Sequence, residues 1–136
     1  MWQHEYSIET SAPPVTIWAI FCDVPGWPKW IDGLDNAEMT GSFETGTELT
    51  LTPSGQASVS SRLIEVKENA GFIDESRHGD VVIRVDHRIQ QIASDRTRIV
   101  YAIQVSGPSA ENIGQAISAD FQDVLKALAT LAESKK

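Results

Sequence analysis

The strongest constraint on the fold is a series of alternating segments that leads into one amphipathic helix. Residues 81–92 and 97–107 each alternate apolar and polar side chains, and His87 falls on the apolar face of the first segment. Alternation with a period of two is typical of a strand with one buried face. Over residues 110–134 the apolar side chains instead recur at helical spacing. A sheet must bury its apolar face, and this helix is the only predicted element long enough to cover it.

Before these two strands and the long helix, the sequence predicts further strands and two short helices. Residues 15–22 (VTIWAIFC) are apolar at helical spacing and end at Pro25 and Gly26, which stop a helix. The prolines beside Trp27 and Trp30 leave room only for a short second helix or a turn. The other strands are expected at residues 3–10, 36–40, 47–52, 57–66 and 71–76.

The order of these elements predicts an α+β fold in one domain, residues 1–136. It contains an antiparallel sheet of about six to seven strands, two short helices after the first strand, and a long C-terminal helix. A chain of 136 residues suits a single domain and buries enough surface for a proper core.

The net charge argues against nucleic acid and anionic membranes as partners, and the cysteine content indicates the cellular compartment. The chain has 11 basic and 19 acidic residues, a net charge of -8, which disfavours nucleic acid and anionic membrane surfaces. The single cysteine, Cys22, cannot form an intrachain disulfide, which fits a reducing compartment. We see no signal peptide and no apolar run long enough for membrane insertion, so we expect a cytoplasmic protein.

The turns fix an expected register around His87. A two-residue turn at Gly79-Asp80 places Phe72 opposite His87 and leaves Asp74 on the same face. A three-residue loop at residues 94–96 places Ile103 opposite His87, with Tyr101 as its diagonal neighbour.

These positions give three candidates for chemistry. His87 is either a general acid/base or a hydrogen-bond partner of the ligand, or else a core or edge histidine satisfied by a backbone carbonyl or by Tyr101. Asp74 either pairs with His87 and orients its ring or lies in water at the open end of the sheet. Tyr101 either polarises a ligand carbonyl or packs with a hydrated hydroxyl. We expect no metal, because the three histidines are scattered, and no cofactor, because the chain has no phosphate loop or dinucleotide fingerprint.

In its order of residues the chain resembles the START-like (SRPBCC, or Bet v 1-like) superfamily and its polyketide cyclase/dehydrase-like branch. The likeness spans nearly the whole chain, although each motif is weak by itself. The residues that carry it are Ser7-Ile8, Ala12-Pro13, Trp18, Asp23, Trp27, Trp30, Gly46, Ile64-Glu65-Val66, His87, Thr97-Arg98, Gly107, Leu125-Lys126-Ala127-Leu128 and Glu133.

The resemblance implies a helix-grip fold, in which a curved sheet grips the long helix and leaves a ligand cavity between them. In such a fold Trp27 and Trp30 lie near the mouth of the cavity, where they contact a ligand or cover the end of the sheet as core. Side chains expected to contact the ligand are Trp27, Trp30, Leu51, Val59, Phe72, Ser76, Ile83, Val85, Ile103, Ile117 and Phe121.

Three functions remain open at this point. The first is binding of a hydrophobic small molecule that is polyketide-, lipid- or aromatic-like. The second is a cyclase or dehydratase in which His87 acts as acid/base with Asp74 and Tyr101. The third is a protein-interaction role, as a chaperone cofactor or toxin–antitoxin element. Homodimerisation is left open as well.

Overall fold

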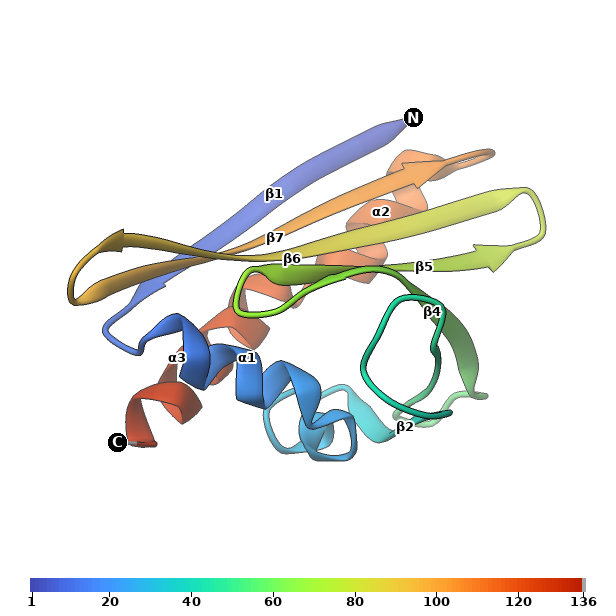
Figure 1. The fold of residues 1–136 in the computed structure, drawn as a ribbon. Helices are drawn as coiled ribbons and strands as arrows, with labels where there is room; N and C mark the ends of the chain where they lie inside the picture. The colour runs from blue at the N-terminus through green and yellow to red at the C-terminus, as the bar shows by residue number, and fades with distance from the viewer. Residues whose placement is uncertain (136) are drawn as a thin grey trace.

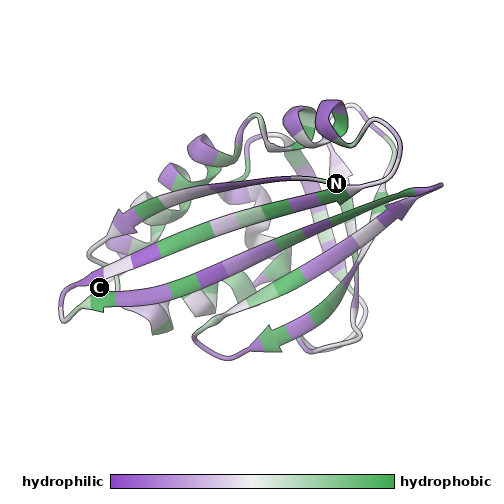
Figure 2. Cartoon of the chain, turned by 90° about the horizontal axis from the view of Figure 1, so that it is seen from above, coloured by the Kyte–Doolittle hydropathy of each residue, from purple (hydrophilic) through white to green (hydrophobic). Residues whose placement is uncertain are grey.

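A computed structural model describes residues 1–135 and has the expected helix-grip architecture (Figure 1). All seven strands form one antiparallel sheet in the order β1-β7-β6-β5-β4-β3-β2, so the first strand pairs with the last. Hydrophilic and hydrophobic residues alternate along the long strands (Figure 2), as the sequence pattern requires. The strands are β1 (Trp2–Thr10), β2 (Leu34–Met39), β3 (Glu48–Pro53), β4 (Val59–Lys67), β5 (Gly71–His78), β6 (Val81–Ala93) and β7 (Arg96–Ser106).

The two short elements after β1 are the helix α1 (Pro14–Cys22) and the 3-10 helix η1 (Val24–Lys29). Pro25 lies in the first turn of η1, where its missing N–H costs little, and Pro28 keeps the element short. None of the helices within residues 1–135 has both the length and the apolar character needed to cross a bilayer.

The C-terminal helix spans the predicted residues but is bent into α2 (Ala110–Ser118) and α3 (Phe121–Ser134). The Ser118 hydroxyl donates to the carbonyl of Gly114 at 2.8 Å, a bond to the preceding turn that often bends a helix. Asp120, at the start of α3, leaves the helical region with φ -104° and ψ 4°. The long C-terminal helix predicted over these residues is therefore confirmed, and the structure adds a bend at Ala119 and Asp120.

The predicted register is right on one side of β6 and wrong on the other. Phe72 pairs with His87 across β5 and β6, as the Gly79-Asp80 turn indicated. Across β6 and β7, however, Tyr101 pairs with His87, and Ile103 pairs with Val85. The β6–β7 turn has two residues, and a register shift between Gln91 and Ala93 displaces the pairing. Tyr101 is therefore a direct neighbour of His87, not a diagonal one.

The core has two parts that meet under the bent helix. The larger part is centred on Phe21 of α1, Leu63 of β4 and Leu128 of α3. The smaller part lies under α2 and contains Val81, Ile83, Val85, Ile103 and Val105. Side chains of both parts border the space between sheet and helix, which fixes the walls of the site described next.

Candidate functional site

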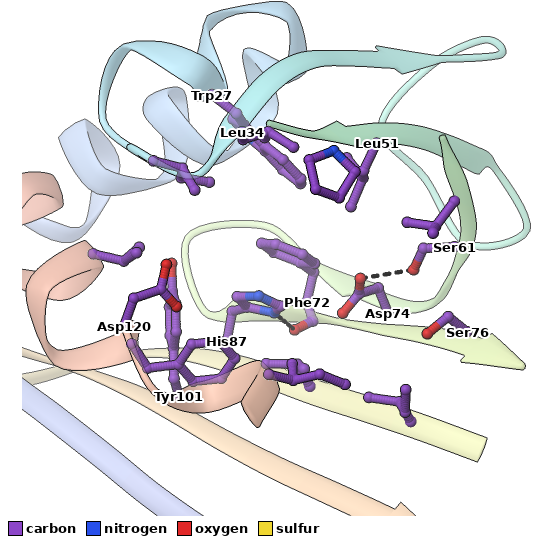
Figure 3. A pocket seen from close by; sticks show the side chains of 18 of the residues that line it. Trp27, Leu34, Leu51, Ser61, Phe72, Asp74, Ser76, His87, Tyr101 and Asp120 are labelled. Carbon is purple, nitrogen blue, oxygen red and sulfur yellow. Dashed lines mark hydrogen bonds between the residues drawn. The ribbon is translucent and has the colours of Figure 1, made fainter. Parts of the chain in front are cut away.

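A cavity of about 390 Å³ lies between the concave face of the sheet and the bent C-terminal helix (Figure 3). This volume falls within the range of small-molecule sites. The strands β5, β6 and β7 supply one wall, and η1, β2, β3 and β4 supply the opposite wall. The segment from α2 to α3 borders a third side.

The structure brings together thirteen of the fourteen side chains predicted for the site. Ile103 is the exception, because the register shift places it opposite Val85, where it is fully buried in the smaller core cluster. The predicted residues that do line the cavity are Trp27, Trp30, Leu51, Val59, Phe72, Asp74, Ser76, Ile83, Val85, His87, Tyr101, Ile117 and Phe121.

Eight lining residues were not predicted, although two of them carry a signal in the sequence. Ser61 follows Val59 by two residues on β4, so strand alternation alone places both on one face. Asp120 lies three residues after Ile117, the spacing of one helix face. The other six are Ile31, Leu34, Pro53, Gln56, His78 and Val124.

The ring of His87 is held by a hydrogen bond at one nitrogen, and its other nitrogen can accept a hydrogen bond from a ligand in the cavity. Its Nδ1 lies 3.2 Å from the carbonyl oxygen of Phe72, and a carbonyl only accepts, so Nδ1 carries the proton and donates. The ring stacks on Phe72 with centroids 4.0 Å apart and meets Tyr101 edge-on at 4.6 Å. Nε2 is therefore left as a hydrogen-bond acceptor.

Burial lowers the pKa of His87 below its ordinary value, because the charged imidazolium loses its hydration there. The negative charges of Asp74 and Asp86 and a bond to the Phe72 carbonyl act in the opposite direction, but they are the smaller effects. The ring is therefore neutral near pH 7 and can accept a proton or a hydrogen bond.

Asp74 is hydrogen-bonded to Ser61 within residues 1–135, and its bond to His87, one of the two roles considered above, is not formed. Its Oδ2 instead accepts a hydrogen bond from the Ser61 hydroxyl at 2.7 Å (Figure 3). Its Oδ1 is buried and has no hydrogen-bond partner within residues 1–135. A buried carboxylate oxygen without a donor is costly, so this atom has unused capacity to accept a bond.

Tyr101 is a neutral phenol at the same wall. Its pKa is raised far above the ordinary value, first by burial and then by the negative charges of Asp74 and Asp120. Its ring packs edge-on against Phe121 at 5.5 Å. The phenol therefore keeps its proton at any physiological pH and can donate it in a hydrogen bond.

Trp27 and Trp30 are both buried and both line the cavity. The indole N–H of Trp27 donates to the carbonyl of Phe21 at 3.0 Å, which ties η1 to α1. Trp27 also stacks on Phe72 with centroids 6.0 Å apart, and Trp30 packs against Phe21. Since the polar atom of Trp27 is already satisfied, this side chain offers the cavity only an apolar surface.

The polar groups of the site come from several elements, and most of the remaining wall is apolar. Figure 3 places His87, Tyr101 and Asp120 near one another, and Asp74 beside Ser61. Within residues 1–135 no three His, Cys, Asp or Glu side chains are grouped so that they could hold a metal ion.

Comparisons with known proteins support the architecture. A family model described as polyketide cyclase / dehydrase and lipid transport matches residues 1–133. No curated protein matches the sequence. Solved structures with a similar fold include norcoclaurine synthase from Thalictrum flavum, at 16% identity and a TM-score of 0.78, covering 99% of this chain and 88% of that one.

Two further structures are similar over nearly their whole length. The Zhui aromatase/cyclase from a Streptomyces species has 13% identity and a TM-score of 0.79, covering 98% of this chain and 94% of that one. A START superfamily protein from Mycobacterium smegmatis has 16% identity and a TM-score of 0.77, covering 98% and 99%. At these identities the likeness establishes the fold alone.

Proposed function

The chain belongs to the polyketide cyclase / dehydrase and lipid transport family, and we propose that it binds a hydrophobic small molecule in the cavity between sheet and helix. The observation that carries this proposal is the cavity itself, about 390 Å³ with a largely apolar wall and a few polar groups. Apolar walls supply affinity through burial, and a few polar groups fix the orientation of the ligand.

Aromatic side chains favour a ligand with a flat ring. The aromatic residues that border the cavity are Phe72, Tyr101 and Phe121, together with Trp27 of η1 and Trp30, which directly follows η1. Rings prefer offset-stacked or edge-on neighbours, so a planar ligand gains contact on several sides. Norcoclaurine synthase, which has a similar fold, was crystallised in complex with dopamine and hydroxybenzaldehyde, and both compounds contain an aromatic ring. That likeness supports a ring-shaped ligand here as well.

The test is a fluorescence titration with the neutral apolar dye N-phenyl-1-naphthylamine. Val85→Phe adds volume on the cavity wall and should weaken binding by about tenfold or more. Val82→Phe is the matched control, because Val82 lies on the same strand but on the opposite face of the sheet. Equal affinity in both variants, or no binding by the natural protein, would count against the proposal.

A second candidate is acid–base catalysis, which the pairing of His87 with Tyr101 favours. In this mechanism Nε2 of His87 removes a proton from the carbon next to a ligand carbonyl. The electron pair of the broken C–H bond forms the carbon–carbon double bond of an enolate, while the π pair of the carbonyl moves to its oxygen, which accepts a hydrogen bond from the Tyr101 hydroxyl. A base positioned in this way typically increases the reaction rate by about 10²–10⁴-fold.

Proton exchange tests this second function without knowledge of the natural substrate. The methyl protons of 2-acetylnaphthalene would be followed by NMR in heavy water. Catalysed exchange that disappears in His87→Gln supports the base, and Tyr101→Phe should slow the exchange by a smaller factor. Exchange at the same rate with natural protein, His87→Gln and no protein would rule out the base for ketones of this size.

A further inference from the structure

The cavity has an unbalanced negative charge. Asp74 and Asp120 are both among its lining residues, and none of the described lining residues is lysine or arginine. The pKa of His87 is lowered by burial, so this side chain adds no positive charge near pH 7. A ligand therefore meets carboxylates there, and no guanidinium or ammonium group that would neutralise an acid.

The arginines nearest in sequence cannot supply that positive charge, because they project from the opposite face of the sheet. Arg84 lies on β6 between Ile83 and Val85, which both line the cavity, so alternation points it outward. There it donates to Glu75 at 2.6 Å. Arg62 likewise pairs with Glu48 at 3.0 Å on exposed side chains. Neither arginine is therefore placed to bind a ligand carboxylate inside the cavity.

Asp74 also has unused hydrogen-bonding capacity. Ser61 donates to one carboxylate oxygen, and the other oxygen, Oδ1, is buried without a partner. The torsion that turns a carboxylate is broad, so a modest rotation exposes either oxygen to a ligand at low cost. An anionic ligand would leave Oδ1 unpaired and add repulsion, whereas a ligand with N–H donors would satisfy it.

Asp120 adds a second carboxylate at the bend between α2 and α3. Its negative charge acts on the Tyr101 hydroxyl, as does that of Asp74, so both carboxylates add negative potential on the side of the cavity where Tyr101 lies. Figure 3 shows Asp120 of the helix bend beside Tyr101, and Asp74 on the other side of His87, next to Ser61. A cation within this side is attracted by both groups, and the partly desolvated setting strengthens that attraction.

We infer that the cavity selects a hydrophobic amine: an apolar ring system whose protonated nitrogen donates to Asp74, with Asp120 adding attraction from the helix bend. The inference rests on the proposed function, since it assigns the charge of the ligand bound there. It predicts that fatty acids and other hydrophobic carboxylates bind poorly, although their apolar parts fit the same walls.

Three probes with the same ring and different charge test this selection. They are 2-naphthylmethylamine, 2-naphthylmethanol and 2-naphthoic acid, which at about pH 7 are cationic, neutral and anionic. Isothermal titration calorimetry should find the amine roughly 10- to 100-fold tighter than the alcohol, the size of a charge-assisted hydrogen bond. The acid should bind more weakly than the alcohol.

Variants then assign the effect to the carboxylates. Asp74→Asn keeps the shape of the side chain and should reduce the preference for the amine over the alcohol to a few-fold at most. Asp120→Asn should reduce it by a smaller factor. Asp35→Asn is the control, because its side chain bonds Ser54 at an exposed position and does not line the cavity. Circular dichroism and thermal melting of each variant check that the fold is retained independently of ligand binding.

The outcomes separate this inference from the function on which it rests. If the alcohol binds but amine and acid bind equally well, or the acid binds best, the charge selection is wrong and the hydrophobic site remains. A preference for the amine that survives Asp74→Asn also overturns the assignment to Asp74. If none of the three probes binds, both the selection and the hydrophobic site fail.

Discussion

Protonation of His87 should destabilise the folded protein as the pH falls below about 6.5. Burial lowers the pKa of the ring in the fold, whereas an unfolded chain holds a histidine of ordinary pKa near 6.5. Between these two values the unfolded state binds a proton that the folded state does not. The free energy of unfolding therefore decreases with decreasing pH in this window.

The size of the effect follows from the single proton involved. One proton bound only by the unfolded state changes the free energy of unfolding by at most about 1.4 kcal/mol per pH unit. From about pH 6.5 to pH 5 the loss is therefore up to roughly 2 kcal/mol. Asp74 and Asp86 attract the imidazolium and make the loss smaller, but desolvation is the larger effect.

Urea unfolding at about pH 7, 6 and 5 measures how the free energy of unfolding changes with pH. The natural protein should lose up to about 2 kcal/mol more over this range than His87→Gln, which cannot be protonated. His4→Gln is the control, because His4 is exposed on β1 and should leave the slope of the natural protein unchanged. Parallel pH curves for the natural protein and His87→Gln would refute the reasoning.

Three further changes test the packing and charge of the structure. Gly71→Ala should cost about 2–4 kcal/mol, because a Cβ there would overlap the carbonyl oxygen of His87 at a φ of +142°. Leu128→Ala should cost about 2–5 kcal/mol, because this side chain is fully buried in the main core. Arg84→Gln should raise the pKa of Glu75, which its hydrogen bond to Arg84 now lowers, and NMR titration of the carboxyl would measure the rise.

Each of these changes has a matched control. Gly55→Ala also has a positive φ, of +71°, but has no atoms within 4 Å of the added Cβ, so it should cost less than Gly71→Ala. Lys126→Ala on the exposed side of α3 should leave stability within about 0.5 kcal/mol. Arg98→Gln removes an arginine that donates a hydrogen bond to Glu9, and it should leave the pKa of Glu75 unchanged. A change as large in any control as in its partner would contradict the stated cause.

Turn chemistry and strand alternation were enough to predict most of the site. The Gly79-Asp80 turn fixed the pairing of Phe72 with His87, and six positions that line the cavity followed from it: Phe72, Asp74, Ser76, Ile83, Val85 and His87. Alternation is a local property of the chain, so once a single pair of residues is right, the face of the strand is right as well.

The parts that were missed depend on non-local packing. Nothing in residues 94–96 distinguishes a three-residue loop from a two-residue turn next to a register shift, and this choice decides whether Ile103 or Tyr101 meets His87. The bend that sets Asp120 against the cavity accompanies the bond from Ser118 to Gly114, and the Ser118 hydroxyl also lies 2.9 Å from the Tyr6 hydroxyl of β1, a contact between residues far apart in sequence. Apolar periodicity continues across the bend and gives no sign of it.

The central claim is that the space between the sheet and the bent helix receives an apolar ligand. A crystal structure of the protein grown with N-phenyl-1-naphthylamine tests it most directly. We predict electron density for the dye between Phe72, Tyr101 and Phe121, with its amine nitrogen toward Asp74. Dye bound only on the outer face of the sheet, or a cavity filled by the protein's own side chains, would contradict the account.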